Sequence, residues 1–170
     1  MIRFVGSGAE DYLSDLVVIE EESFHHPMTE AQLHALCRAG STMWVLADAP
    51  EASDGRIVGS VWCQVVLDEG YIGNVAVRRD FRRQGIADSL LRALDTAAEE
   101  KNLRFLTLEV REGNRTAISL YKKHGYTPVG VRKNYYQNPR ENALLMTKHF
   151  PGSKEFEERH KQNSHEDTGI

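Results

Sequence analysis

An arginine-rich turn is the first part of the chain whose residue types suggest chemistry. The stretch "VRRDFRRQGIADSLLRAL", 77–94, leads into a segment with leucines at helical spacing. A helix start offers backbone N–H groups without internal partners and the positive end of the helix dipole, so it attracts anions. Around it stand the small residues Gly85 and Ala87 and the donor side chains of Arg82, Arg83 and Gln84. The turn suits a pyrophosphate, although a solvated loop whose arginines face water fits the spacing as well.

A carboxylate inside an alternating segment is the second feature. In "FLTLEV", 105–110, Glu109 falls on the face opposite Leu106, Leu108 and Val110. A charged residue in a strand needs an explanation. One explanation is an edge carboxylate that pairs with Arg111 or with another basic side chain.

The elements that must position these groups follow from periodicity and from turn residues. Thr29 with Gln32 forms a capping box, Asn114 is a good N-cap, and Gly125 is a good left-handed helix stop. We expect a hairpin turn at 68–70, strands over 2–5, 42–47, 56–68, 71–77, 105–110, 129–136 and 143–149, and helices over 11–24, 29–40, 90–98 and 114–125. This order predicts an α/β (α+β) single domain with a mixed, mainly antiparallel sheet of about seven strands flanked by about four helices.

Bulk properties limit the class of protein. The 170 residues carry a net charge of -4, so the arginines are a local concentration, and a general nucleic-acid binder would be more basic. There is no apolar run of the roughly 18 to 20 residues that a membrane span needs, and the start lacks a signal pattern, so we expect a cytoplasmic protein without a membrane or nucleic-acid partner.

Cys37 and Cys63 are expected to be buried free thiols, and no residue set predicts a metal site. We expect one domain over 1–150 and a polar, disordered tail over 151–170.

Several motifs taken together resemble one known family. The segments "QVVLDE", "RRQGIA", "LEVREGNRTAISLY" and "KNYY" are similar to the acetyl-CoA-binding core of the GNAT N-acetyltransferases. Within that family they look like the ribosomal-protein-alanine acetyltransferases, the RimI type. The resemblance covers about residues 2–150 and is most specific over 64–136.

The resemblance implies a coenzyme site, with acetyl-CoA as cosubstrate and no metal. Backbone amides of the arginine turn would hold the coenzyme pyrophosphate, the preceding strand would offer backbone groups to the acetyl and pantetheine arm, and Asn114 would contact the coenzyme or only cap its helix. The residues implied are Val75, Ala76, Val77, Arg83, Gln84, Gly85, Ile86, Ala87, Asp88 and Asn114.

The resemblance also implies the reacting groups. Glu109 matches the general base, which acts directly or through water, and Tyr121 matches the general acid that protonates the coenzyme A thiolate; simple packing is the other explanation for the tyrosine. Tyr135 and Tyr136 match substrate-side tyrosines, although ordinary strand aromatics would look the same.

The acceptor is the least determined part of the prediction. An N-terminal amine titrates near 7.7 to 8.0, whereas a lysine near 10.4 needs roughly 3.5 kcal/mol more for deprotonation, which favours an α-amine. The resemblance points to the N-terminal alanine of a small-subunit ribosomal protein, and the enzyme would be a monomer or homodimer. The alternatives are a lysine or small-molecule amine as acceptor and a non-catalytic acyl-CoA sensor. Met28, which replaces an aromatic residue of the family, and the long 48–55 loop leave the peptide specificity open; His25 and His26 are expected to be exposed.

Overall fold

The computed structural model describes residues 1–5, 8–49 and 55–151. The chain forms two compact units, one from Met1–Val66 with Tyr71–Thr96 and the other from Leu67–Gly70 with Ala97–Ile170. The units are described one at a time, as the first and the second unit. The expected tail begins at the last described residue, so the rest of it lies outside the described residues.

The sheet of the first unit has the strand order β1-β2-β3-β4. Its strands are β1 (Ile2–Val5), β2 (Thr42–Asp48), β3 (Ile57–Val66) and β4 (Glu69–Val77). Pairs β1–β2 and β2–β3 are antiparallel, and a bulge interrupts the second pair between Ala47 and Asp48. All seven residues of β2 are buried, as expected for a strand that is covered on both faces.

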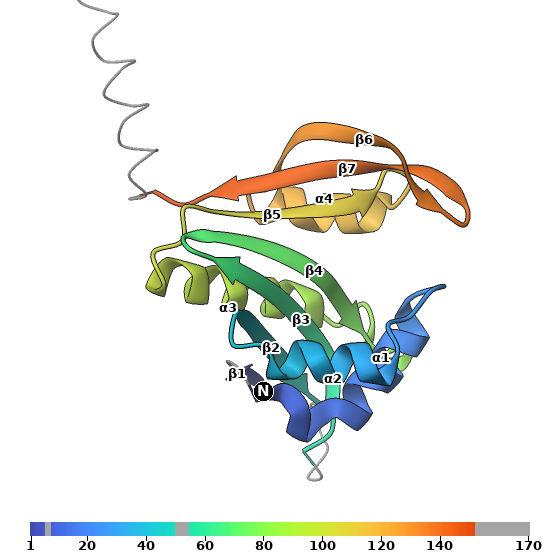
Figure 1. Cartoon of the computed structure of the whole chain (residues 1–170), viewed down its shortest axis with the longest axis vertical. Coiled ribbons are helices and arrows are strands. Elements are labelled where there is room, and N and C mark those ends of the chain that lie inside the picture. Colours follow the sequence, from blue (N-terminus) through green and yellow to red (C-terminus); the bar gives the residue numbers. More distant parts are fainter. Residues whose placement is uncertain (6–7, 50–54, 152–170) are drawn as a thin grey trace, which may run out of the picture. The chain divides into compact units, whose positions relative to one another are not determined.

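Apolar helix faces explain that burial. Helices α1 (Leu13–Ser23) and α2 (Glu30–Arg38) pack on one face of the sheet (Figure 1). The cluster there includes Leu16, Ile19, Leu33, Cys37, Trp44 and Leu46. On β3, a Cβ added at Gly59 would lie 2.9 Å from Ile86 and 3.2 Å from Leu90, both on α3 (Ile86–Glu100), so a bare backbone lets this helix approach closely.

Local signals place the helix starts in the first unit. The capping box of α2 is confirmed, because the Gln32 N–H donates to the Thr29 hydroxyl at 3.3 Å and the Thr29 N–H donates to the Gln32 side chain at 2.9 Å. The first helix was predicted from residue 11. A 3-10 turn, η1 (Ala9–Tyr12), comes first, and α1 begins only at Leu13.

The second unit carries three strands with the order β5-β7-β6, and both pairs are antiparallel. They are β5 (Phe105–Arg111), β6 (Thr127–Gln137) and β7 (Arg140–His149). Between β5 and β6 lies α4 (Arg115–Lys123). Its N-cap Asn114 accepts a hydrogen bond from the Ala117 N–H at 3.2 Å, and Gly125 follows it with a φ of 86°, as the sequence predicted. Strands β6 and β7 are longer than predicted, because their antiparallel pairing continues beyond the apolar residues.

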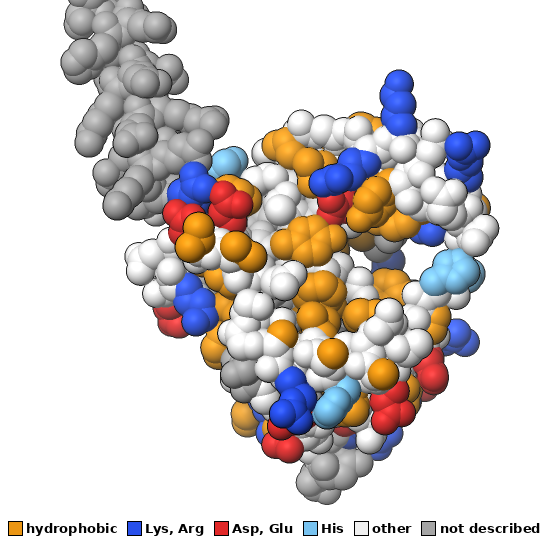
Figure 2. Space-filling view, viewed as in Figure 1, with side chains coloured by type: hydrophobic (Ala, Val, Ile, Leu, Met, Phe, Trp, Pro, Cys, Tyr) orange, Lys and Arg blue, Asp and Glu red, His pale blue; other side chains and the backbone are white. Residues whose placement is uncertain are grey.

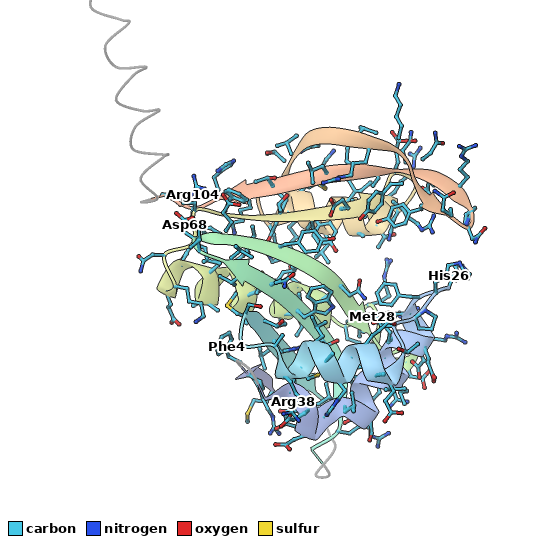
Figure 3. The ribbon with its side chains drawn as sticks, in the orientation of Figure 1. Phe4, His26, Met28, Arg38, Asp68 and Arg104 are labelled. Carbon is cyan, nitrogen blue, oxygen red and sulfur yellow. The ribbon has the colours of Figure 1, made fainter. Side chains whose placement is uncertain are left out.

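The turn before β4 differs from the prediction. The sequence suggested 68–70, but Glu69 and Gly70 belong to β4, and Leu67 takes the left-handed conformation with a φ of 57°. Arg104 fixes this turn: its N–H donates to the Asp68 carbonyl at 2.7 Å and its Nε lies 2.9 Å from the Asp68 carboxylate (Figure 3). A side-chain anchor distant in sequence therefore sets the turn position.

Gly73 gives a test of the packing in the first unit. A Cβ at this position would lie 1.7 Å from the nearest indole carbon of Trp62, on the neighbouring strand. We expect Gly73→Ala to lower the free energy of unfolding by about 1 to 3 kcal/mol, because the ring must move out of a packed face. Chemical denaturation measures the change. Gly40→Ala is the matched control, since nothing lies within 4 Å of its Cβ position; equal stability of the two variants would contradict the packing.

Candidate functional site

The arginine turn of the first unit is an open loop with two left-handed residues. Arg83 has a φ of 64° and Gly85 a φ of 79°, and a Cβ added at Gly85 would meet nothing within 4 Å. Glycine adopts this conformation without strain, whereas an arginine does so at a cost. The backbone at Gly85 is therefore accessible to a ligand. The sequence predicted the special glycine but gave no signal for Arg83.

The start of α3 supplies the amides of the predicted cradle. The first helical hydrogen bond runs from the Ser89 N–H to the Gly85 carbonyl at 3.0 Å. The N–H groups of Ile86, Ala87 and Asp88 thus come before the first intrahelical bond and stand at the positive end of the helix dipole. The Asp88 carboxylate pairs with Arg92 at 2.8 Å, so the backbone of Asp88, and not its side chain, suits an anion.

Side chains of the turn mostly hold the turn itself. Arg82 donates from Nε to the Val77 carbonyl at 2.8 Å and from Nη2 to the Glu22 carbonyl at 3.0 Å. Gln84 donates to the Asp80 carbonyl at 3.3 Å. The sequence suggested that Arg82 and Gln84 add donors for a ligand. In the structure, the Arg82 side chain instead connects the end of β4 with the end of α1.

Glu22, near the end of α1, fixes the beginning of the turn. Its carboxylate accepts a hydrogen bond from the Arg79 N–H at 2.8 Å and lies 3.3 Å from the guanidinium of Arg78. The Arg79 N–H is the main cause that lowers the pKa of Glu22, and the charge of Arg78 adds to it. Sequence reasoning missed Glu22, because nothing local connects it with a turn more than fifty residues away.

The predicted coenzyme strand is the end of β4. Ala76 and Val77 are buried and Val75 is partly buried. Just before them, Asn74 donates from Nδ2 to both carboxylate oxygens of Glu20, at 3.0 and 3.1 Å. These contacts connect β4 to α1.

Glu20 also fixes the segment between α1 and α2. It is 5% exposed, and its Oε1 accepts a hydrogen bond from the Met28 N–H at 3.1 Å. Burial raises the pKa of Glu20, and the two hydrogen-bond partners oppose that shift. Sequence reasoning missed this residue; the signal was an acid four residues after Leu16 on the apolar face of a helix.

The segment between the two helices carries the departures from the family pattern. Met28 is partly buried against the apolar cluster of the first unit, whereas His25 and His26 are exposed, as predicted. Figure 3 labels His26 and Met28 on this segment. The methionine thus fills a position that faces the core.

Glu109 of the second unit is nearly buried and ion-paired. Its side chain is 6% exposed, and Oε1 lies 3.0 Å from Nε of Arg132 on β6. Oε2 is buried and has no hydrogen-bond partner among the described residues. The pairing expected for a strand carboxylate is therefore present, but the partner is Arg132. Arg111 instead pairs with Glu141 at 3.0 Å.

The two tyrosines of β6 border this ion pair. The Tyr136 hydroxyl donates to the Glu109 carbonyl at 3.4 Å, and the guanidinium of Arg111 lies 4.1 Å from the Tyr136 ring centre. Tyr135 is 45% exposed, and Arg132 lies 5.7 Å from its ring centre. The structure thus brings Tyr135, Tyr136 and Glu109 together through Arg132, a residue that the sequence analysis did not single out.

Tyr121 is buried on α4. Burial, and secondly the neighbouring Tyr136, raises the pKa of Tyr121 to about 12, so the phenol stays protonated at neutral pH. Its ring makes an edge contact with Tyr126, with 5.9 Å between the ring centres. Packing of this ring is therefore observed, and a proton is available on its oxygen. For Asn114, the capping role is observed, and contact with a coenzyme remains a prediction.

The described residues also bear on the expectations for surface charge, metal ligands, membrane helices and cysteines. On the face shown in Figure 2, basic side chains are interspersed with acidic ones. Within residues 1–5, 8–49 and 55–151, no His, Cys, Asp or Glu cluster is placed to hold a metal ion. No helix of that same part of the chain is long and apolar enough to cross a membrane. Cys37 and Cys63 are buried free thiols, as predicted.

Comparison with known proteins identifies the family. Residues 9–126 match the model of the acetyltransferase (GNAT) family. The chain is 36% identical over 129 residues to a putative ribosomal protein bS18-alanine N-acetyltransferase of Bacillus subtilis, which covers 75% of this chain and 83% of the relative. It is 39% identical over 95 residues to the ribosomal protein bS18-alanine N-acetyltransferase of Escherichia coli K12, covering 55% of this chain and 64% of that relative.

Solved structures agree with this family. The crystal structure of the ribosomal-protein-S18-alanine N-acetyltransferase of Escherichia coli has a TM-score of 0.78 at 28% identity, covering 91% of this chain and 98% of that chain. Arabidopsis thaliana NAA60 in complex with acetyl-CoA has a TM-score of 0.78 at 19% identity, covering 89% of this chain and 100% of the other, and so shows a common fold.

The chain belongs to the acetyltransferase (GNAT) family. It is an acetyl-CoA-dependent N-acetyltransferase, and the predicted α/β fold class with seven strands and four α-helices among the described residues is confirmed.

Glu22 gives a pH-dependent test of the turn anchor. Its pKa is lower in the folded protein than the ordinary value of 4.5, so the ionised carboxylate stabilises the fold above that value, and this contribution disappears as the pH falls through the lowered pKa. We expect Glu22→Gln to lower the melting temperature at pH 7 and the difference from the parent to shrink below about pH 4. Thermal unfolding across pH measures this. Exposed Glu21→Gln is the control, and a difference for Glu22→Gln that stays constant with pH would contradict the anchor.

Proposed function

We propose that this protein transfers the acetyl group of acetyl-CoA directly to the N-terminal α-amine of a protein, most specifically a small-subunit ribosomal protein. The observation that carries the proposal is Glu109, a nearly buried carboxylate with one oxygen paired and the other without a partner among the described residues. Buried polar atoms normally have hydrogen-bond partners, so an oxygen without one is suited to receive a proton from a bound group.

The coenzyme is assigned to the first unit. Amides of Arg83, Gln84, Gly85, Ile86, Ala87 and Asp88 would hold its pyrophosphate, and the backbone of Val75, Ala76 and Val77 would hold its acyl arm. The open backbone at Gly85 and the position of the turn at the start of α3 support this assignment, because a helix start with an accessible backbone favours a close anionic ligand. For Asn114, whose side chain caps α4, the predicted contact with a coenzyme stays a proposal.

Glu109 is assigned as the general base. An amine attacks a thioester only when its lone pair is free, so the ammonium of the acceptor must lose a proton, directly or through water. The carboxylate takes this proton, the nitrogen bonds to the acetyl carbon, and the carbon–sulfur bond breaks. The transfer needs no acyl-enzyme intermediate.

Tyr121 is assigned as the general acid. The departing thiolate gains from a proton, and the pKa of about 12 keeps the Tyr121 phenol protonated at neutral pH. Transfer from a phenol of such a pKa to a thiolate is uphill in water, so the benefit must come from the position of the hydroxyl.

The acceptor assignment is supported by chemistry and by relatives. An α-amine is partly neutral near pH 7, so a single carboxylate suits it better than it suits a lysine. The named relatives from Bacillus subtilis and Escherichia coli act, by their names, on the alanine of ribosomal protein bS18. Tyr135 and Tyr136 would line the place of the peptide, since Tyr136 donates to the Glu109 carbonyl and Tyr135 lies beside Arg132.

The acceptor is tested by release of free thiol from acetyl-CoA. The panel holds an alanine-starting ribosomal peptide, the same peptide with a blocked N-terminus, a lysine peptide and small polyamines. We expect release with the free peptide and none with its blocked twin, since only the former presents a neutral α-amine. Activity confined to the lysine peptide or the polyamines would replace the substrate but keep the enzyme class, and coenzyme binding without any turnover would favour a sensor.

The base is tested by Glu109→Gln. We expect the rate at saturating acetyl-CoA to fall by about 10²-fold or more, because the amide cannot accept the proton, while coenzyme binding measured by calorimetry stays unchanged. Glu112→Gln is the matched control, an exposed carboxylate just beyond the same strand. A parental rate in Glu109→Gln would remove this residue from the mechanism.

A further inference from the structure

We propose that Arg132 is the positioning residue for the base: its guanidinium occupies Oε1 of Glu109 and so directs the incoming proton to Oε2. The inference deepens the proposed function and rests on Glu109 as the base. It starts from the single contact of 3.0 Å between Arg132 Nε and Glu109 Oε1.

The strand register explains how this contact forms. Glu109 on β5 is opposite Leu145 on β7, and Leu145 is opposite Gly130 on β6. Arg132 is opposite Ala143, two residues along, so its side chain must cross β7 diagonally to meet the carboxylate. Directly opposite residues share a face of the sheet, and so do residues two apart along a strand.

Glu109 and Arg132 differ in exposure, and this difference determines how costly the ion pair is to bury. The Glu109 side chain is 6% exposed, and that of Arg132 is 56% exposed. A carboxylate at that depth is costly unless a charge or hydrogen bonds meet it, whereas the guanidinium remains largely hydrated. The arginine therefore stabilises the carboxylate in one orientation without a full desolvation cost of its own.

The neighbouring Arg111 is not placed to substitute for Arg132. Arg111, two residues from Glu109 and on the same face, pairs with Glu141 at 3.0 Å and also donates to the Pro139 carbonyl at 3.1 Å. The Tyr136 ring, 4.1 Å away, further fixes that guanidinium. Arg111 and Arg132 thus have separate acidic partners, and Oε1 of Glu109 pairs with Arg132.

The consequence for the reaction is a choice between two oxygens. With Oε1 paired, Oε2 is the carboxylate oxygen that can take the proton of the acceptor ammonium or of an intervening water. One N–H or water O–H bond breaks and one O–H bond forms at Oε2, which leaves the amine neutral for attack. Rotation of the carboxylate would spoil this geometry, and misplacement of a reacting group by about 1 Å costs up to about 10²-fold in rate.

The test compares Arg132→Met with Arg132→Lys in the full chain. We expect Arg132→Met to lower kcat by about tenfold or more with little change in the KM for acetyl-CoA, because the base and not coenzyme binding is disturbed. Arg132→Lys should recover most of kcat, since the contact is a single N–O pair that an ammonium can also make. Lys133→Met is the control: it removes the same charge from the next, exposed residue of β6. A parental kcat in Arg132→Met, or a kcat in Arg132→Lys as low as in Arg132→Met, would overturn the inference.

A double-mutant cycle separates this inference from the proposed function. If Arg132 acts through Glu109, Arg132→Met should lower kcat in the parent but not in the Glu109→Gln variant. An undiminished rate in Glu109→Gln would defeat the base assignment itself. An impaired Glu109→Gln variant, together with equal losses from Arg132→Met in both backgrounds, would defeat only the role of Arg132.

Discussion

A carboxylate removed from water must be met by donors or by positive charge, and each unit of this protein contains one at a place that matters. In the first unit, Glu20 is 5% exposed and accepts hydrogen bonds from Asn74 and from the Met28 N–H. In the second, Glu109 is 6% exposed and pairs with Arg132. Because an unmet buried charge costs several kcal/mol, these contacts restrict the arrangement of the backbone around them.

Each of the two carboxylates connects segments that are distant in sequence. Glu20 joins α1, the end of the segment before α2, and β4, which leads into the arginine turn. Glu22 contacts Arg78 and Arg79, and Arg82 donates to the Glu22 carbonyl, so the end of α1 also supports the first part of that turn. The arginines of the turn thus have mainly structural contacts, and the anion-binding capacity rests on backbone amides. Arg83, in a left-handed conformation, shows that some conformational strain is accepted there.

Local patterns predicted most of the fold because they depend on neighbours in the chain. The capping box at Thr29, the N-cap at Asn114 and the stop at Gly125 all form as the sequence indicated, since each needs only residues within one helical turn. The alternation in β5 also placed Glu109 correctly, on the face of the strand that does not carry Leu106 and Leu108. The turn before β4 was wrong by about one residue, because Arg104, far along the chain, fixes its position.

The sequence by itself determined the order of elements, the family and the residues that carry its motifs, because motif residues and periodicities are properties of short segments. The tertiary structure decided which charges meet. Arg111 is two residues from Glu109, yet the carboxylate pairs with Arg132, because strand pairing through β7 brings a distant strand within reach and gives Arg111 another acid. Pairing across a sheet depends on register, and register is set by the packing of whole strands, which no short stretch of sequence contains.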